Sequence, residues 1–202
     1  MSVFSKIFGS NSDKSKDKSE KKEQHKFLPD ENAPVDEAFT MNFNNNGGKF
    51  LYCETIDEVQ SNLEKIVEEN NWSTKTALIL NERLKEKFKG FNFNTTTKSE
   101  DADFLFTTCE YLIASDGSLL ISSNQIAEKK LAELPKDFVV FATTSQFVEN
   151  ISTGLQGIKV QNKKNIPSNI TTIKHFKVDE TNNFLSYGSS SKNLYLLLLE
   201  DL

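Results

Sequence analysis

The sequence predicts an α/β fold built on one sheet that helices cover on both faces, because short apolar runs alternate with amphipathic stretches along the chain. KFLYC at residues 49–53 and TALIL at residues 76–80 are typical of buried strands. Between them, Thr55 is expected to cap a helix over residues 56–70, where apolar side chains recur every three or four positions. With 202 residues, 37% of them apolar, the chain is long enough for one domain with a sizeable core.

The other predicted elements continue this alternation. A short helix at residues 34–43 ends in an Asn-Asn-Asn-Gly-Gly turn before the first strand, and residues 81–88 form another helix. Residues 109–115 and 118–123 are predicted to be consecutive strands around a polar turn. Further strands are expected at residues 102–108, 137–143 and 193–200, and further helices at residues 126–134 and 145–158.

The N-terminal segment differs in composition from the rest of the chain. Residues 9–26 contain no apolar side chain, so we expect residues 1–32 to be a flexible tail rich in Lys and Ser, followed by a single domain at residues 33–202. Residues 3–8 carry apolar side chains at helical spacing. They are either a site of weak, reversible membrane contact or a frayed chain start.

Charge and cysteine content bound the class of protein. Residues 1–26 have a formal charge of +3 and the remainder carries −8, and an acidic body argues against nucleic-acid binding. Cys53 and Cys109 have no histidine near them, so we expect no metal site or cofactor in this chain, and any iron–sulfur cluster belongs to a partner protein. The apolar run at residues 194–199 is too short to cross a bilayer, and no secretory signal is recognisable, which favours a cytoplasmic protein with reduced thiols.

Polar residues near strand ends mark the candidate ligand site, because ligands of open α/β sheets lie beyond the carboxyl ends of strands. Asp116 is a candidate general base, but Asp-Gly is also the strongest signal for a tight hairpin, and both roles can hold. The turn at Thr143 and Thr144 offers N–H groups to an anion, unless Ser145 merely caps its own helix. The predicted ligand is a small anion, and the predicted ligand-binding residues are Ser115, Asp116, Gly117, Ser118, Thr143, Thr144, Ser189, Ser190 and Lys192.

Four segments, in this order, resemble the LUD-domain family, which includes lactate utilization protein C. They are FTMNFNNNGGKFLYCETIDEVQSNL, YLIASDGSLLISSNQ, KKLAELPKDFVVFA and GSSSKNLYLLLLED, and the resemblance covers about residues 35–202. It implies a fold similar to that of sugar-phosphate isomerases and CoA transferases. It also implies a cluster-free role beside Cys-rich iron–sulfur proteins that oxidise L-lactate to pyruvate. Because CoA transferases of that fold use a glutamate nucleophile, Glu110 is a second catalytic candidate beside Asp116.

Two departures from the family pattern bear on function. Relatives usually carry Glu-Thr-Gly-Thr where this chain has Ser-Asp-Gly-Ser at residues 115–118, so the acid stands one place later, and successive strand residues point to opposite faces. A late Gly-Pro-Ser stretch and an Ala-Asp-Ile-Glu run are replaced by residues 167–184. Three functions stay open: an anion-binding accessory subunit of a lactate-utilization type system, a transferase or isomerase for CoA esters or sugar phosphates, and a diverged interaction module tethered by its N-terminus.

Overall fold

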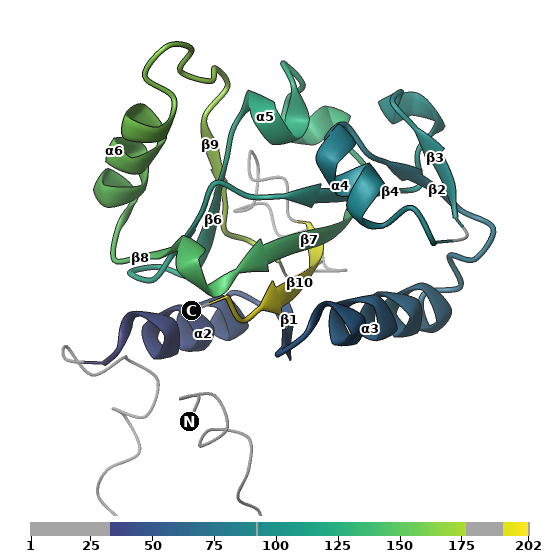
Figure 1. Cartoon of the computed structure of the whole chain (residues 1–202), viewed down its shortest axis with the longest axis horizontal. Helices are drawn as coiled ribbons and strands as arrows, with labels where there is room; N and C mark the ends of the chain where they lie inside the picture. The colour runs from purple at the N-terminus through teal and green to yellow at the C-terminus, as the bar shows by residue number, and fades with distance from the viewer. Residues whose placement is uncertain (1–32, 92, 177–191, 202) are drawn as a thin grey trace, which may run out of the picture.

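The computed structural model describes residues 33–91, 93–176 and 192–201, and its centre is a six-stranded sheet whose strands all run parallel (Figure 1). The order across this sheet is β1-β10-β7-β4-β2-β3. Its strands are β1 (Lys49–Cys53), β2 (Thr76–Leu78), β3 (Asn94–Thr96), β4 (Phe104–Thr108), β7 (Asp137–Thr143) and β10 (Asn193–Leu199). A second, four-stranded sheet has the order β8-β5-β6-β9, from β5 (Tyr111–Ile113), β6 (Ser118–Ile121), β8 (Phe147–Val148) and β9 (Thr171–Ile173).

The strands of the large sheet send alternate side chains into two separate cores. Along β10, Leu194, Leu196 and Leu198 belong to one core, while Tyr195 and Leu197 belong to the other. A parallel sheet that is buried on both faces needs strands that are apolar almost throughout, and this explains the run of leucines in β10. The predicted α/β class is confirmed.

Two helices, α3 (Ile56–Glu69) and α4 (Glu82–Lys87), cover one face of the large sheet. As predicted, Thr55 caps α3, and its hydroxyl accepts a hydrogen bond from the N–H of Glu58 at 3.2 Å. Beside α3, Trp72 stacks on Phe104 of β4 with ring centroids 4.4 Å apart. Such aromatic pairs stabilise a core beyond their area of burial.

The opposite face is covered by α2 (Val35–Asn45), α5 (Ser123–Ile126) and the four-stranded sheet. Phe39 and Phe43 of α2 are buried there together with Leu112 of β5. The remaining helix, α6 (Ile151–Gln161), packs on the outer side of the small sheet, where Ile158 belongs to a third core with Tyr111. The small sheet is thus sandwiched between the large sheet and α6, an arrangement that the sequence pattern did not predict (Figure 1).

The prediction of a helix at residues 126–134 is wrong. Helix α5 ends at Ile126, Ala127 has a φ of 52°, and only a 3-10 turn follows at Leu131–Glu133. The carbonyls of Ala127 and Lys129 accept hydrogen bonds from the Asn169 amide, each at 2.9 Å. These two acceptors are therefore bonded across the chain, and not by a further helical turn.

The helix expected at residues 145–158 begins later than predicted. Phe147 and Val148 form β8, which pairs in parallel with β5, and the Asn150 side chain then caps α6 by accepting from the N–H of Thr153 at 3.1 Å. The short strands β3 and β9 also lie in segments that carried no strand prediction. Both are edge strands rich in Thr, without the apolar alternation on which a prediction depends.

Several expectations fall on residues that the structure does not describe. The tail at residues 1–32, with its apolar segment at residues 3–8, lies outside the described residues, as do Ser189 and Ser190. Among the helices that are described, none is long and apolar enough to span a membrane.

Candidate functional site

Polar side chains gather where three neighbouring strands end, at the carboxyl edge of the large sheet. Glu110 follows β4, Thr143 and Thr144 stand at the end of β7, and Asp201 follows β10. Since parallel strands end at a common edge, the structure brings together three of the predicted residues, Glu110, Thr143 and Thr144. Asp201 joins them without having been predicted.

The turn after β7 binds a carboxylate of the chain itself. One oxygen of Asp201 accepts hydrogen bonds from the backbone N–H of Ser145 at 2.8 Å and from the Thr144 hydroxyl at 3.0 Å, and the other accepts from the Ser145 hydroxyl at 2.7 Å. Partial burial acts to raise the pKa of Asp201, but these hydrogen bonds outweigh it and hold that pKa below its usual value. The donors that were expected to receive a ligand anion here are already occupied by Asp201.

Replacing Asp201 with asparagine is expected to lower the stability of the protein at neutral pH. The stability of the variant should also change less as the pH is lowered. A carboxylate with a lowered pKa contributes stability above its unfolded pKa, and this contribution is lost as pH falls through the folded pKa. Because Asp201 is exposed, we expect a loss of less than about 1 kcal/mol at pH 7. Urea unfolding of both proteins between about pH 6 and pH 3 measures the difference, which should shrink as the pH falls; a constant difference would contradict the assigned role.

Glu110 is held by the start of α5. One of its carboxylate oxygens accepts hydrogen bonds from the Ser122 hydroxyl at 2.5 Å and from the Asn124 amide at 2.9 Å. The Gln146 amide donates to the Glu110 carbonyl at 3.2 Å and to the Cys109 carbonyl at 2.6 Å, which ties the end of β4 to the turn after β7. The carboxylate that was considered as a nucleophile therefore has two fixed donors and is half-buried.

The neighbouring thiol is not set up as a nucleophile. Burial, together with the nearby Glu110 carboxylate, raises the pKa of Cys109 far above its ordinary value, so the thiol stays protonated. Cys53 is also a free, buried cysteine, and burial raises its pKa as well. The two thiols belong to the cores on opposite faces of the large sheet.

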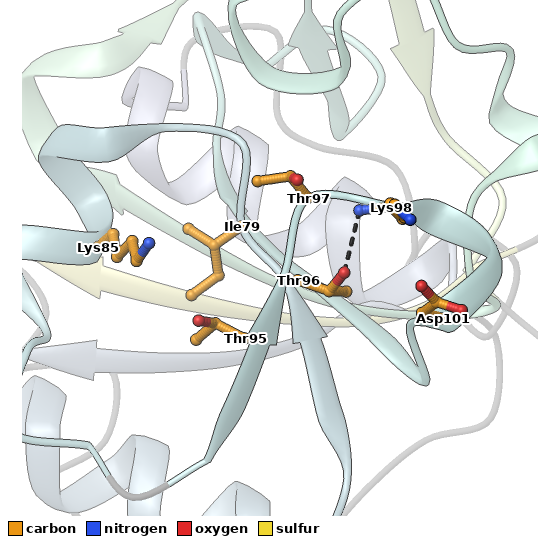
Figure 2. A pocket seen from close by; sticks show the side chains of 7 residues that line it. All are labelled: Ile79, Lys85, Thr95, Thr96, Thr97, Lys98 and Asp101. Carbon is orange, nitrogen blue, oxygen red and sulfur yellow. Dashed lines mark hydrogen bonds between the residues drawn. The ribbon is translucent and has the colours of Figure 1, made fainter.

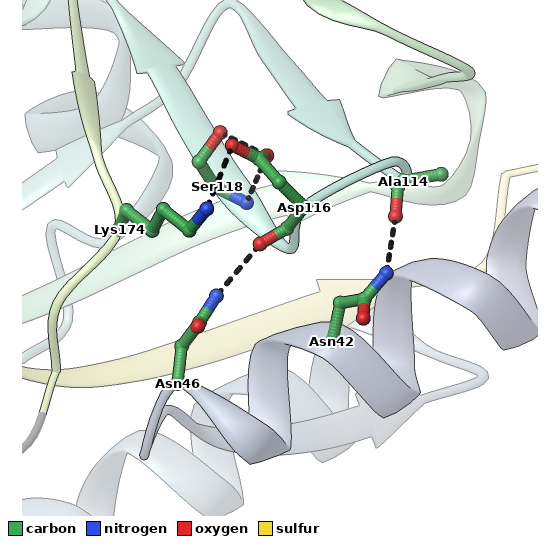
Figure 3. A network of polar contacts seen from close by, with 6 residues as sticks. All are labelled: Asn42, Asn46, Ala114, Asp116, Ser118 and Lys174. Carbon is green, nitrogen blue, oxygen red and sulfur yellow. Dashed lines mark hydrogen bonds and ion pairs between the residues drawn. The ribbon is translucent and has the colours of Figure 1, made fainter. Parts of the chain in front are cut away.

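The turn at residues 115–118 is a structural hairpin tip that docks on α2 (Figure 3). The Asn46 amide donates to the carbonyl of Asp116 at 2.7 Å, and the Asn42 amide donates to the carbonyl of Ala114 at 2.9 Å. The Asp116 carboxylate accepts from the N–H and hydroxyl of Ser118 at 3.1 and 2.6 Å, and it lies 3.5 Å from the Lys174 amine. Both of its oxygens thus have protein partners.

The hairpin tip lies away from the carboxyl edge. Asn46, which it contacts, ends α2 just before β1 begins, so the tip stands beside the amino end of the parallel strands. Lys192 also lies at that amino end, directly before β10. Its buried amine donates to the carbonyls of Leu134 and Pro135 at 3.1 and 2.9 Å. Neither Asp116 nor Lys192 is brought to Thr143 and Thr144.

A cavity that the sequence did not point to lies at the carboxyl ends of β2 and β3 (Figure 2). Its volume is about 320 Å³, and it is lined by Ile79, Lys85, Thr95, Thr96, Thr97, Lys98 and Asp101. In Figure 2 the Lys85 side chain from α4 stands on one side of the threonines, and Lys98 with Asp101 stands on the other. The backbone N–H of Lys98 donates to the Thr96 hydroxyl at 3.1 Å, which leaves that hydroxyl's own proton available to a ligand.

The charges of this cavity favour an anion. Within the described part of the chain, neither Lys85 nor Lys98 forms an ion pair, and two amines face one carboxylate, that of Asp101. Outside the lining, the Lys129 amine donates to the hydroxyl of Ser99, the residue after Lys98, at 3.1 Å. The available signal in the sequence was the Thr-Thr-Thr-Lys run at residues 95–98, but without a strand prediction for β3 nothing placed it at a sheet edge.

The fold and the polar carboxyl edge together define an α/β domain of the kind that places its ligands beyond parallel strands. The model of the LUD domain matches residues 37–198, and the chain belongs to this family. The family expected from the sequence is confirmed.

A solved structure supports the fold. The crystal structure of a DUF162 family protein from Deinococcus radiodurans superposes with a TM-score of 0.57 and 10% sequence identity, over 83% of this chain and 96% of that chain. At this level of sequence identity, the similarity supports a shared fold alone. No curated protein matches this chain.

Proposed function

We propose that this chain is a small-anion-binding accessory subunit of an L-lactate utilization type system, which oxidises lactate to pyruvate. The observation that carries the proposal is the cavity at the carboxyl ends of β2 and β3, with three threonine side chains and two lysine amines that have no ion-pair partner among the described residues. Amines supply charge to a carboxylate or phosphate, and hydroxyls supply directional hydrogen bonds. This position is where an α/β sheet offers its ligand site.

The redox chemistry of such a system is assigned to partner proteins. Cys53 and Cys109 lie on opposite faces of the large sheet, so they do not meet at one metal. Among the described residues, no group of three or more His, Cys, Asp or Glu side chains is arranged to hold a metal ion. We therefore propose Cys-rich iron–sulfur proteins as partners and the cytoplasm as the compartment, in agreement with two reduced thiols.

The double variant Lys85→Gln/Lys98→Gln is expected to lower affinity for small anions at least about tenfold, because charge-assisted hydrogen bonds are the strong ones. Calorimetric titration of the full chain with L-lactate, pyruvate and inorganic phosphate gives the affinities. The matched control is Lys65→Gln/Lys89→Gln, which removes the same charge from exposed positions outside the cavity. Equal affinities for the two double variants, or no anion bound by the natural chain, would overturn the site.

Partnership is tested separately from ligand binding. The tagged full chain is purified from its native cells grown with lactate, and the eluate is analysed for iron and for Cys-rich proteins. We expect iron–sulfur proteins to co-purify with the chain and with its Lys85→Gln/Lys98→Gln variant alike. Recovery of the chain alone and free of iron would contradict the accessory role but leave the anion site standing.

A further inference from the structure

All of the large apolar side chains that stand exposed in the described part of the chain lie within one stretch of twenty residues. They are Ile151, Leu155, Val160, Ile166 and Ile170, and Val160 is 63% exposed. The first three belong to α6 and the other two to the segment that follows it. Scattered exposed apolar residues need no explanation, but their confinement to a single segment sets this segment apart from the rest of the described surface.

The same segment is free of acidic residues, although the chain as a whole carries a net charge of −5. Between Asn150 and Phe176 there are four lysines and no Asp or Glu. Lys174 pairs with Asp116, while Lys159, Lys163 and Lys164 are exposed. Within the segment itself, apolar side chains are therefore interspersed with positive charge only, and the acids beside it, Glu128 and Glu149, belong to neighbouring stretches of the chain.

The fold holds this segment in place on its outermost layer. In Figure 1 α6 stands at one side of the molecule, beyond the small sheet, and the segment after it returns to β9 past α5. Asn169 is bonded to two carbonyls near α5, Pro167 is buried, and the Ser168 hydroxyl donates to the Glu128 carboxylate. The exposed isoleucines on either side of this anchored stretch are consequently held outward.

We propose that the α6 surface, defined as residues 151–170, docks on an anionic lipid surface. Helix α6 packs by one face on the small sheet and leaves other side chains exposed, as a helix that lies in a bilayer interface must. Lysines bind acidic headgroups while apolar side chains enter the interface. The inference does not depend on the proposed anion site.

The test is co-sedimentation of the full chain with vesicles of phosphatidylcholine, with and without about one third phosphatidylserine. Lys159→Gln/Lys163→Gln/Lys164→Gln should weaken binding to the anionic vesicles about fivefold for each lysine removed. Val160→Ser/Ile166→Ser should weaken it several-fold at unchanged charge. Both sets alter exposed side chains, and circular dichroism verifies that the variants are folded.

The matched control is Lys65→Gln/Lys89→Gln/Lys136→Gln, which removes three exposed lysines from other faces and should leave binding within about twofold of the natural chain. Loss of binding in the α6 variants but not in the control supports docking through α6, since the N-terminal segment is intact in all of them. Equal binding by all variants would overturn the proposal. So would failure of the natural chain to sediment with anionic vesicles, or binding to soluble polyglutamate in their place, which indicates an acidic protein partner.

Discussion

Replacing Gly117 with alanine should destabilise the domain by about 3 kcal/mol or more. Gly117 has a φ of 67°, a backbone conformation that costs free energy for any residue with a Cβ. A Cβ at this position would also stand 2.3 Å from the backbone nitrogen of Phe43 and 2.4 Å from the carbonyl carbon of Asn42. These are backbone atoms of α2, so the overlap is relieved only if the hairpin lifts away from the helix.

Urea denaturation of the purified variant measures this loss. The matched control is Gly90→Ala, because a Cβ there meets nothing within 4 Å, and its stability should remain within about 0.5 kcal/mol of the natural protein. A Gly117→Ala protein as stable as the control would mean that the tip does not dock on α2 as described. The expected loss of stability would show that the Ser-Asp-Gly-Ser turn stabilises the fold. This agrees with the hydrogen bonds and the ion pair that occupy the Asp116 carboxylate.

Stability should rise by about 2 kcal/mol between pH 8 and pH 10 through Lys192. Burial lowers the pKa of this amine to about 8, against the opposing effect of Asp137, whereas in the unfolded chain the pKa is ordinary. In that window the unfolded state binds more protons than the folded state, so stability increases with pH. The neutral amine still has protons to donate to the carbonyls of Leu134 and Pro135.

The measurement is urea unfolding at both pH values for the natural chain and for Lys192→Met. The variant keeps a long side chain beside Phe138, whose ring lies 5.1 Å from the amine, but it cannot titrate. We expect the rise to be absent in Lys192→Met and present in Lys65→Met, which alters an exposed lysine. A rise of the same size in all three proteins would show that another group causes it.

The central strands were predictable from the sequence because burial on both faces makes them apolar almost throughout, as in β7 and β10. Helix α3 was predictable for two independent reasons, its Thr55 cap and its apolar periodicity. The helix predicted at residues 126–134 was wrong because the local pattern does not reveal a distant contact. Asn169, about forty residues away, donates hydrogen bonds to two carbonyls of that stretch. Tertiary contacts decided the local structure there.

The candidate site was predictable only in part. Thr143 and Thr144 were placed correctly at the end of an apolar strand, whereas Glu110 was expected inside a strand at residues 109–115 and instead follows β4. Asp116 resembles them in sequence, but it follows a strand of the small sheet, so its turn points to the other end of the large sheet. The Lys85 and Lys98 cavity depends on β3, a polar edge strand that carries no apolar pattern to predict it.

Amide chemical shifts of the isotope-labelled full chain, followed during titration with L-lactate, pyruvate and inorganic phosphate, test the central claim most directly. If the cavity beyond β2 and β3 is the anion site, the amides of residues 95–98 shift in a saturable manner, and those of residues 115–118 stay in place. Saturable shifts confined to the hairpin tip or to the turn at Thr144, or no shifts with any of the three anions, would contradict it.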